Sequence, residues 1–297
     1  MSGVLHLVDA SYFIFRAYYS VEPGMAGADG RAVNALYGFA RFLGDLLERA
    51  RPGLVAVAFD ESLDSSFRNE IYPAYKANRE PAPPDLAHQF ALCRELCRLL
   101  GVAEYGSGAY EADDIIGAIA TRMRAYGEAC VLVTRDKDLA QLVREGDEFW
   151  DFAGDRRYGY GDIAGQFGVQ PERMADYLAL TGDSVDNIPG VPGVGPKTAA
   201  ALLSVFESLE DLYARLDEVP ALPLRGAARL PARLAEHRDA AFLARRLTRI
   251  ACDMPLAFEP DDLARRAPAV EALEAFYDHA GFGAMLRRQA RRIADRL

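Results

Sequence analysis

The chain has 297 residues, of which 51% are hydrophobic and 26% are charged, and its formal net charge at pH 7 is −10. This composition excludes an intrinsically disordered chain and is typical of a globular protein. No apolar run is as long as a membrane span requires, and the first ten residues lack a basic leader and a cleavage site, so we expect a cytoplasmic protein with no membrane partner.

Three short apolar runs predict the buried strands of a mostly parallel sheet. They are VLHLV at 4–8, LVAVAF at 54–59 and CVLVT at 130–134. Segments with helical spacing separate them, for example 31–50, and this alternation is typical of an α/β fold. Acids follow the three runs: Asp9, Asp60, and then Asp136 with Asp138. Because sites in such folds lie beyond the carboxyl ends of the strands, we expect these acids at one edge of the sheet.

The segment between the second and third runs is long for a simple connection. Residues 67–101 begin basic and aromatic, are interrupted by prolines between 81 and 84, and continue as a helix. Such a length suggests a functional excursion. A further helix is predicted at 110–123, and its first turn carries Glu111, Asp113 and Asp114. These acids could belong to a site or could simply interact favourably with the helix dipole.

Acids at strand ends and in closely spaced groups form one candidate metal site: Asp9, Asp60, Glu111, Asp113, Asp114, Asp136, Asp138, Asp183 and Asp186. Gathered together, they would repel one another unless divalent cations were bound. Oxygen ligands suit Mg²⁺ or Mn²⁺ rather than zinc, and two such ions would stabilise both oxygens of an in-line phosphoryl displacement. The histidines lie outside these motifs, and His6, Cys93 and Cys97 are expected in the core.

The stretch PGVPGVGPKTAAALL, at 189–203, resembles a helix-hairpin-helix. Gly193 and Gly195 would let phosphate oxygens approach backbone N–H groups, and the N-terminus of the following helix favours negative charge. Lys197 and Thr198 lie in its first turn, where the lysine adds a positive charge that does not read sequence. The alternative interpretation is an ordinary turn before a helix.

The C-terminal part of the chain is basic. Residues 221–297 contain 14 Arg, no Lys and 10 acids, which is compatible with a phosphate-binding surface beside an acid-lined metal site. The only lysines of the chain, Lys76, Lys137 and Lys197, each lie in one of the motifs described here.

In their order and combination these motifs resemble the bacterial 5′-to-3′ exonuclease family, the flap-endonuclease-like proteins related to the N-terminal nuclease domain of DNA polymerase I. The matching segments are VDASYFIFRAYY (8–19), FD (59–60), FRNEIYPAYKANR (67–79), YEADD (110–114), TRDKDLAQL (134–142) and LTGDSVDNIPGVPGVGPKTAAALL (180–203). The resemblance covers residues 4–205. It implies a PIN-like α/β core at 1–170, with a helical arch at about 67–100, and a helix-3-turn-helix DNA-binding region at 171–297.

The resemblance also implies roles for individual residues. The nine acids would bind two divalent ions, and Lys76 and Arg79 on the arch would contact the scissile phosphate. Tyr75 could stack on an unpaired base or simply pack within the arch. A monovalent cation such as K⁺ would be held in the hairpin loop, mainly by backbone oxygens, at Leu180, Thr181, Pro189, Val191 and Val194.

We therefore expect a structure-specific 5′ nuclease that leaves 5′-phosphate and 3′-hydroxyl ends. Its partners would be DNA with free 5′ ends, 5′ flaps or nicks, including RNA primer strands, in replication or repair, and the protein would be a monomer. Two alternatives remain open at this point: a catalytically weak module that binds flap DNA, and a PIN-type ribonuclease.

Overall fold

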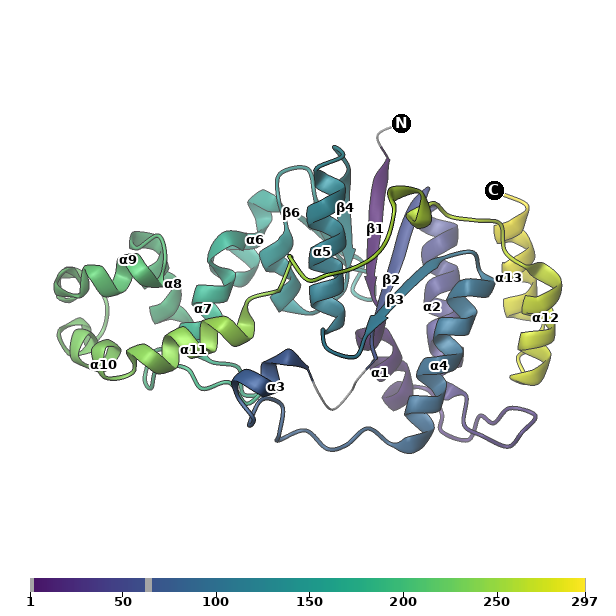
Figure 1. The fold of residues 1–297 in the computed structure, drawn as a ribbon, viewed down its shortest axis with the longest axis horizontal. Helices are drawn as coiled ribbons and strands as arrows, with labels where there is room; N and C mark the ends of the chain where they lie inside the picture. Colours follow the sequence, from purple (N-terminus) through teal and green to yellow (C-terminus); the bar gives the residue numbers. More distant parts are fainter. Residues whose placement is uncertain (1–2, 62–65, 297) are drawn as a thin grey trace.

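The computed structural model describes residues 3–61 and 66–296. At its centre is a six-stranded sheet in the order β3-β2-β1-β4-β5-β6 (Figure 1). All neighbouring strands are parallel except β5 and β6, which are antiparallel. The strands are β1 (Val4–Asp9), β2 (Leu54–Asp60), β3 (Ala103–Ser107), β4 (Ala129–Val133), β5 (Glu148–Asp151) and β6 (Arg156–Gly159). The predicted α/β fold and its three apolar strands are thus confirmed.

Both faces of the sheet are buried, which explains why the central strands are apolar at almost every position. In β1, Leu5 and Leu7 face one hydrophobic cluster, whereas Val8 faces the other. Helix α5 covers the first face. The second is covered by α1, α2 and α4. These helices are α1 (Ala10–Ser20), α2 (Asn34–Ala50), α4 (Pro84–Leu99) and α5 (Ala112–Arg124). Cys93 and Cys97 are buried in the second cluster as free thiols, and His6 is buried in β1, as predicted.

The segment expected to form an arch has little regular structure above the sheet edge. It consists of the short helix α3 (Phe67–Ile71), an irregular stretch at 72–83, and then α4. Ser66 caps α3 through a reciprocal capping box with Asn69, which fixes where the excursion begins.

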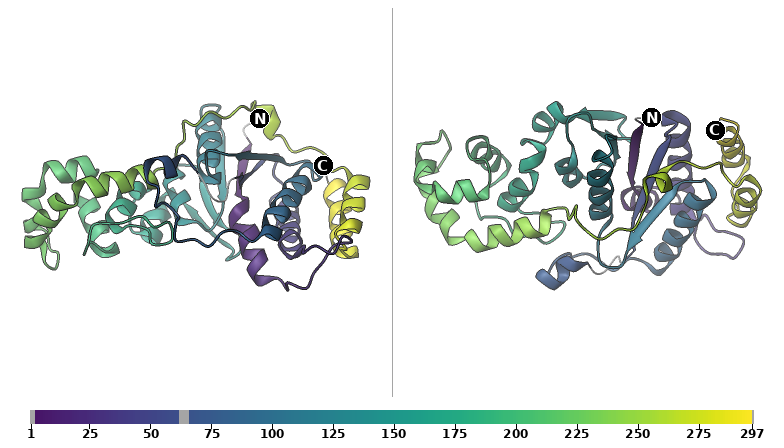
Figure 2. Two further views of the ribbon diagram at one scale, coloured as in Figure 1. Left: turned by 60° about the horizontal axis from the view of Figure 1, so that its bottom comes forward. Right: turned by 45° about the horizontal axis from the view of Figure 1, so that its top comes forward.

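A helical extension projects from the β6 side of the sheet (Figures 1 and 2). It contains α6 (Tyr160–Phe167), α7 (Met174–Thr181), α8 (Pro196–Val205), α9 (Leu209–Ala214), α10 (Leu230–Glu236) and α11 (Arg238–Thr248). Its apolar residues, such as Leu202 and Leu247, belong to the same cluster as those of α5. The extension is therefore packed continuously with the core.

After α11 the chain returns across the core as an extended strap. Backbone N–H groups of Arg265 and Arg266 donate to the carbonyls of Gly53 and Gly101, both at 2.9 Å. Helices α12 (Val270–His279) and α13 (Ala284–Ala294) then pack at the end of the molecule opposite α9 and α10 (Figures 1 and 2).

The region at 171–297 is divided between two parts of the molecule, and its predicted role in DNA binding stays a prediction. Residues 250–297 return to the core, and only the helices up to α11 form the extension. The arginines of α13 are also not gathered on a phosphate-binding surface beside the hairpin, because Arg292 pairs with Glu48 and Arg291 with Glu274. Within the described part of the chain, each helix is too short or too polar to cross a membrane.

Candidate active site

The carboxyl ends of β1 and β2 carry the first two acids of the site. Asp9 caps α1 by accepting a hydrogen bond from Tyr12 N at 3.2 Å, and its second oxygen accepts one from Thr134 Oγ1 at 2.9 Å. Asp60 accepts a hydrogen bond from Ala112 N at 2.8 Å, which ties the end of β2 to the start of α5. Strand ends and a helix N-terminus therefore meet at one edge, as the sequence predicted.

Beyond β4 a tight turn holds two further acids. Asp136 accepts a hydrogen bond from Asp138 N at 2.9 Å and caps a short 3-10 helix. Burial, followed by the neighbouring carboxylates Asp60 and Asp136, raises the pKa of Asp9 to about 7. Burial and Asp136 raise the pKa of Asp138 to about 8, and the same causes raise that of Asp113 well above its usual range. The repulsion inferred from the sequence is therefore present in the structure.

Glu111, Asp113 and Asp114 lie at the start of α5, where Asp114 is bound by Arg68. Asp114 is fully buried, and both of its oxygens are bonded by Arg68, at 2.7 and 2.8 Å. It also accepts hydrogen bonds from Ala251 N and Glu111 N. Both oxygens of Asp114 are therefore already hydrogen-bonded within the protein, and its role as a metal ligand stays a prediction.

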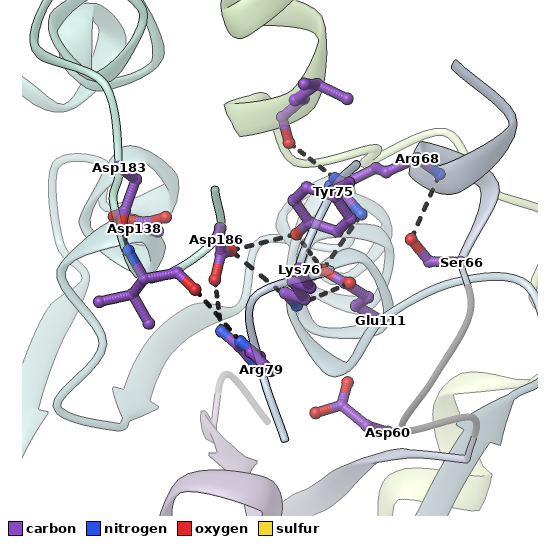
Figure 3. Close-up of polar contacts among 12 residues, drawn as sticks. Asp60, Ser66, Arg68, Tyr75, Lys76, Arg79, Glu111, Asp138, Asp183 and Asp186 are labelled. Carbon is purple, nitrogen blue, oxygen red and sulfur yellow. Dashed lines mark hydrogen bonds and ion pairs between the residues drawn. The ribbon is translucent and has the colours of Figure 1, made fainter. Parts of the chain in front are cut away.

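The irregular stretch that precedes α4 is closed over the acids (Figure 3). Lys76 Nζ lies 2.7 Å from Glu111 Oε1 and 3.9 Å from Asp186 Oδ2, and Arg79 pairs with Asp186. Burial alone would lower the pKa of Lys76, but Glu111 and Asp186 raise it, so the ammonium stays charged. Lys76 has φ 55°, a left-handed backbone conformation that turns the chain toward the site.

Hydrogen bonds to backbone carbonyl groups hold this closed arrangement in place. Lys76 N donates to Asp186 O at 3.0 Å, and Asn78 Nδ2 donates to Ser184 O at 2.8 Å. In the opposite direction, from the acid loop at 183–187 to the excursion, Asn187 Nδ2 donates to Ala74 O at 2.7 Å. The cations of the excursion and the acid loop therefore form one docked unit.

The Tyr75 side chain is packed within the excursion. It is only 4% exposed, and its hydroxyl lies 3.1 Å from both Glu111 Oε2 and Asp186 Oδ2 (Figure 3). Burial and these carboxylates raise the pKa of Tyr75 well above its usual value, so the hydroxyl remains a donor. Of the two interpretations, packing within the excursion is the one that the structure supports.

Lys137 forms a second contact between a cation and the acids. Its Nζ lies 2.7 Å from Asp183 Oδ2 and 3.6 Å from Asp138 Oδ1. Burial alone would raise the pKa of Asp183, but the hydrogen bond and charge of Lys137 outweigh burial and lower it.

A cavity of about 890 Å³ opens in front of these residues. Seven of the predicted acids line it, namely Asp9, Asp60, Glu111, Asp113, Asp136, Asp138 and Asp186, together with Lys76 and Arg79. Sequence reasoning missed another part of its wall, formed by Tyr12, Arg16 and Tyr19 of α1. Their spacing of four and three residues, which places them on one helix face, was the signal that could have found them.

The donor set fits hard divalent cations, because carboxylate oxygens are the ligands that Mg²⁺ and Mn²⁺ prefer. Asp138 Oδ1 is buried without a hydrogen-bond partner, so it is available as a ligand. Among the described residues, however, no group of three or more acids, histidines or cysteines is already arranged around one ion position. Three of the carboxylates, those of Glu111, Asp186 and Asp183, are paired with Lys76, Arg79 and Lys137 respectively.

The predicted hairpin lies between α7 and α8. Gly193 has φ 77°, which requires glycine, whereas Gly195 caps α8 with an extended backbone and has open space where a side chain would be. Lys197 is exposed and Thr198 is half-buried in the first turn of α8. The residues predicted to hold a monovalent cation lie at the end of α7 and in the loop that follows, where Val191 N donates to Leu180 O and Val194 N to Val191 O, each at 2.9 Å. Thr181 ends α7 and Pro189 is exposed.

Solved structures of two other proteins share this fold. The bacteriophage T5 5′-exonuclease with bound zinc superposes with a TM-score of 0.67 and 21% identity over 98% of each chain. The catalytic core of Rad2 in complex with a DNA substrate gives a TM-score of 0.63 and 15% identity, covering 99% of this chain and 92% of that one. The chain therefore shares its fold with these two structures.

Sequence comparison shows the family. Residues 4–168 match the 5′-3′ exonuclease N-terminal resolvase-like domain, and residues 169–271 match the 5′-3′ exonuclease C-terminal SAM fold. The chain therefore belongs to the 5′-3′ exonuclease family, whose members are nucleases of the hydrolase class.

Curated relatives agree with this assignment. DNA polymerase I of Pseudomonas aeruginosa is 41% identical over 94% of this chain, and DNA polymerase I of Rhizobium leguminosarum is 39% identical over 96%. The chain spans only 30% and 28% of the length of these two proteins.

Proposed function

We propose that this protein is a metal-dependent 5′ nuclease that hydrolyses DNA phosphodiesters at or near a free 5′ end or a 5′ flap. The observation that carries the proposal is the cavity in which seven acids meet Lys76 and Arg79. A site lined by acids does not need a nucleophilic side chain, because divalent ions bound there can activate water for phosphoryl transfer.

Eight acids would hold two divalent ions, Mg²⁺ or Mn²⁺: Asp9, Asp60, Glu111, Asp113, Asp136, Asp138, Asp183 and Asp186. When bound, the ions would supply an activated water and stabilise the charge that develops on the phosphate. Lys76 and Arg79 would move away from their present partners, Glu111 and Asp186, and would then contact the scissile phosphate. Their positive charge would stabilise the transition state there. Arg16, on the cavity wall, is suited to a neighbouring phosphate.

The hairpin would hold the duplex part of the substrate. Phosphate oxygens would approach the backbone at Gly193 and Gly195, and Lys197 and Thr198 would add side-chain contacts. A K⁺ ion bound by the carbonyls of the same loop would extend this contact.

The substrates we propose are DNA with 5′ flaps, nicks or free 5′ ends, including strands that begin with an RNA primer, and the products carry 5′-phosphate and 3′-hydroxyl ends. DNA bound to the Rad2 core and divalent ions bound to the T5 enzyme support this assignment. A monomer acting in the cytoplasm, on the bacterial nucleoid in replication or repair, is consistent with these substrates.

End-labelled flap, nicked and single-stranded DNA, incubated with and without Mg²⁺, provide the test. We expect cleavage near the 5′ junction only when Mg²⁺ is present, and none by Asp138→Asn. Binding of the flap without cleavage by the intact protein would favour a binding module, and preferential cleavage of RNA would favour a PIN-type ribonuclease.

A further inference from the structure

We infer that Lys137 is a tethered cation that occupies the carboxylate pair Asp138 and Asp183 until a divalent ion displaces it, and that it thereby makes the two metal sites unequal in affinity. This inference rests on the proposed metal-dependent function. It concerns a residue that the proposed chemistry does not otherwise use.

The first observation is the position of the ammonium. Lys137 Nζ lies 2.7 Å from Asp183 Oδ2 and 3.6 Å from Asp138 Oδ1. Asp138 Oδ1 is buried and has no hydrogen-bond partner, and among residues 3–61 and 66–296 this ammonium is the one cationic group within 4 Å of it. An ion shared by Asp138 and Asp183 would need the oxygens that the lysine now faces, and the two cations would repel each other.

The second observation is an asymmetry among the acids. Within the described residues, Asp9, Asp60 and Asp113 have no lysine, arginine or histidine nitrogen within 4 Å, and neither does Asp136. An ion that enters among these inner acids has no cationic side chain to displace. An ion that enters between Asp138 and Asp183 must first expel an ammonium group. The inner acids are therefore expected to fill first and the outer pair second.

The third observation is the position of Lys137 in the chain. Lys137 stands between Asp136 and Asp138 in the chain, and Asp136 caps the 3-10 helix in which it lies. The ammonium is therefore held close to its acids by a short tether and returns whenever the ion leaves. The side chain is 47% exposed, so it has room to swing outward and can be replaced without disturbing the core.

Mn²⁺ binding to the full chain, measured by electron paramagnetic resonance of the free ion without DNA, tests this inference independently of activity. Lys137→Met removes the charge but retains the length of the side chain. We expect it to tighten the weaker class of Mn²⁺ sites by about tenfold, whereas the tighter class should change much less.

Two variants serve as controls. Lys137→Arg keeps a positive charge and should retain the weaker affinity of the original protein, within about twofold. Lys197→Met removes an exposed lysine of the hairpin and should leave both classes unchanged.

An unchanged or weaker second site in Lys137→Met would overturn the role of Lys137 while leaving the proposed function intact. Equal affinities of the two sites in the original protein would do the same. If the original protein bound no Mn²⁺ at all, both the inference and the proposed metal-dependent function would fail.

Discussion

At the scale of single residues, Asp113 and Asp114 show how adjacent acids acquire different roles. Asp114 is fully buried against Arg68, which is 3% exposed, whereas Asp113 lines the cavity. We expect Asp114→Asn to lower the free energy of unfolding by about 3 kcal/mol, because it leaves the guanidinium without its buried counter-charge. Urea unfolding monitored by circular dichroism measures this loss.

The neighbouring substitution Asp113→Asn is the matched control. It removes a carboxylate that faces Asp9 and Asp136, so we expect stability to be unchanged or raised in the absence of metal. Cleavage, in contrast, should fall by at least about 100-fold if Asp113 holds an ion. Equal losses of stability in the two variants would contradict the distinction drawn here.

Lys76 provides a catalytic prediction. If its ammonium meets the phosphate mainly as charge develops, Lys76→Ala should slow single-turnover cleavage of a 5′-flap substrate by roughly 10²–10³-fold. Affinity measured in Ca²⁺ should change far less. Lys197→Ala is expected to show the reverse pattern, with weaker binding and a nearly normal rate at saturation. A Lys76→Ala rate within about threefold of the original would exclude a catalytic role.

Sequence reasoning at this scale succeeded where strand direction decides the position of a side chain. Asp9 and Asp60 follow apolar strands, and their place at the sheet edge follows from parallel pairing. It could not decide the surroundings of Asp114 and Tyr75. Their orientation depends on partners distant in the sequence, Arg68 and Asp186, and no local pattern contains that information.

At the scale of elements, the hairpin offers a test of backbone access. Gly195 caps α8 with φ −92° and ψ 179°, and a Cβ there would meet nothing within 4 Å. Gly195→Val should therefore fold normally but weaken duplex binding by roughly tenfold, because the side chain would block phosphate approach. Fluorescence anisotropy with duplex DNA measures this affinity.

Gly283 supplies a closely matched control. It caps α13 with φ −77° and ψ −179°, and a Cβ there also meets nothing within 4 Å. Because α13 lies at the opposite end of the molecule from the extension, Gly283→Val should leave DNA affinity unchanged (Figure 1). Equal effects of the two substitutions would argue against a phosphate contact at the hairpin.

The elements that sequence analysis did not find are short or peripheral. Every residue of β3, AEYGS, is half-buried, and β5 and β6 have four residues each, so none shows a clear apolar run. Helix α13 was interpreted through its arginines, but Leu286, Ala290 and Ile293 form a buried face that packs against the core. Its arginines lie on the remaining surface of an amphipathic helix.

At the scale of the whole molecule, the buried acids predict how stability depends on pH. The pKa values of Asp9 and Asp138 rise from 3.8 to about 7 and about 8 on folding. Between pH 4 and 8 the folded state therefore binds more protons than the unfolded state, so the free energy of unfolding falls as pH rises. We expect the Tm of the metal-free protein to fall by roughly 5 °C between pH 5.5 and 8.5.

Calorimetry in the presence of a chelator measures this change. Mg²⁺ or Mn²⁺ added at pH 8.5 should restore much of the lost stability, because an ion that binds only the folded state stabilises it. The double substitution Asp9→Asn with Asp138→Asn should flatten the pH dependence. A Tm that rises with pH across this window in the chelated protein would refute the assigned pKa directions.

The return of the chain end to the core has a consequence for biosynthesis. Gln289 of α13 donates to Asp45 and Glu48 of α2, and a Cβ at Gly44 would meet its side-chain oxygen at 2.3 Å, so the two helices cross closely. These partners are separated by 241 and 244 residues in the sequence. At a translation rate of about 5–20 residues per second, α2 must wait roughly 12–50 s on the ribosome before the helix that covers it has been made. During that interval the part of α2 that α13 later covers remains exposed.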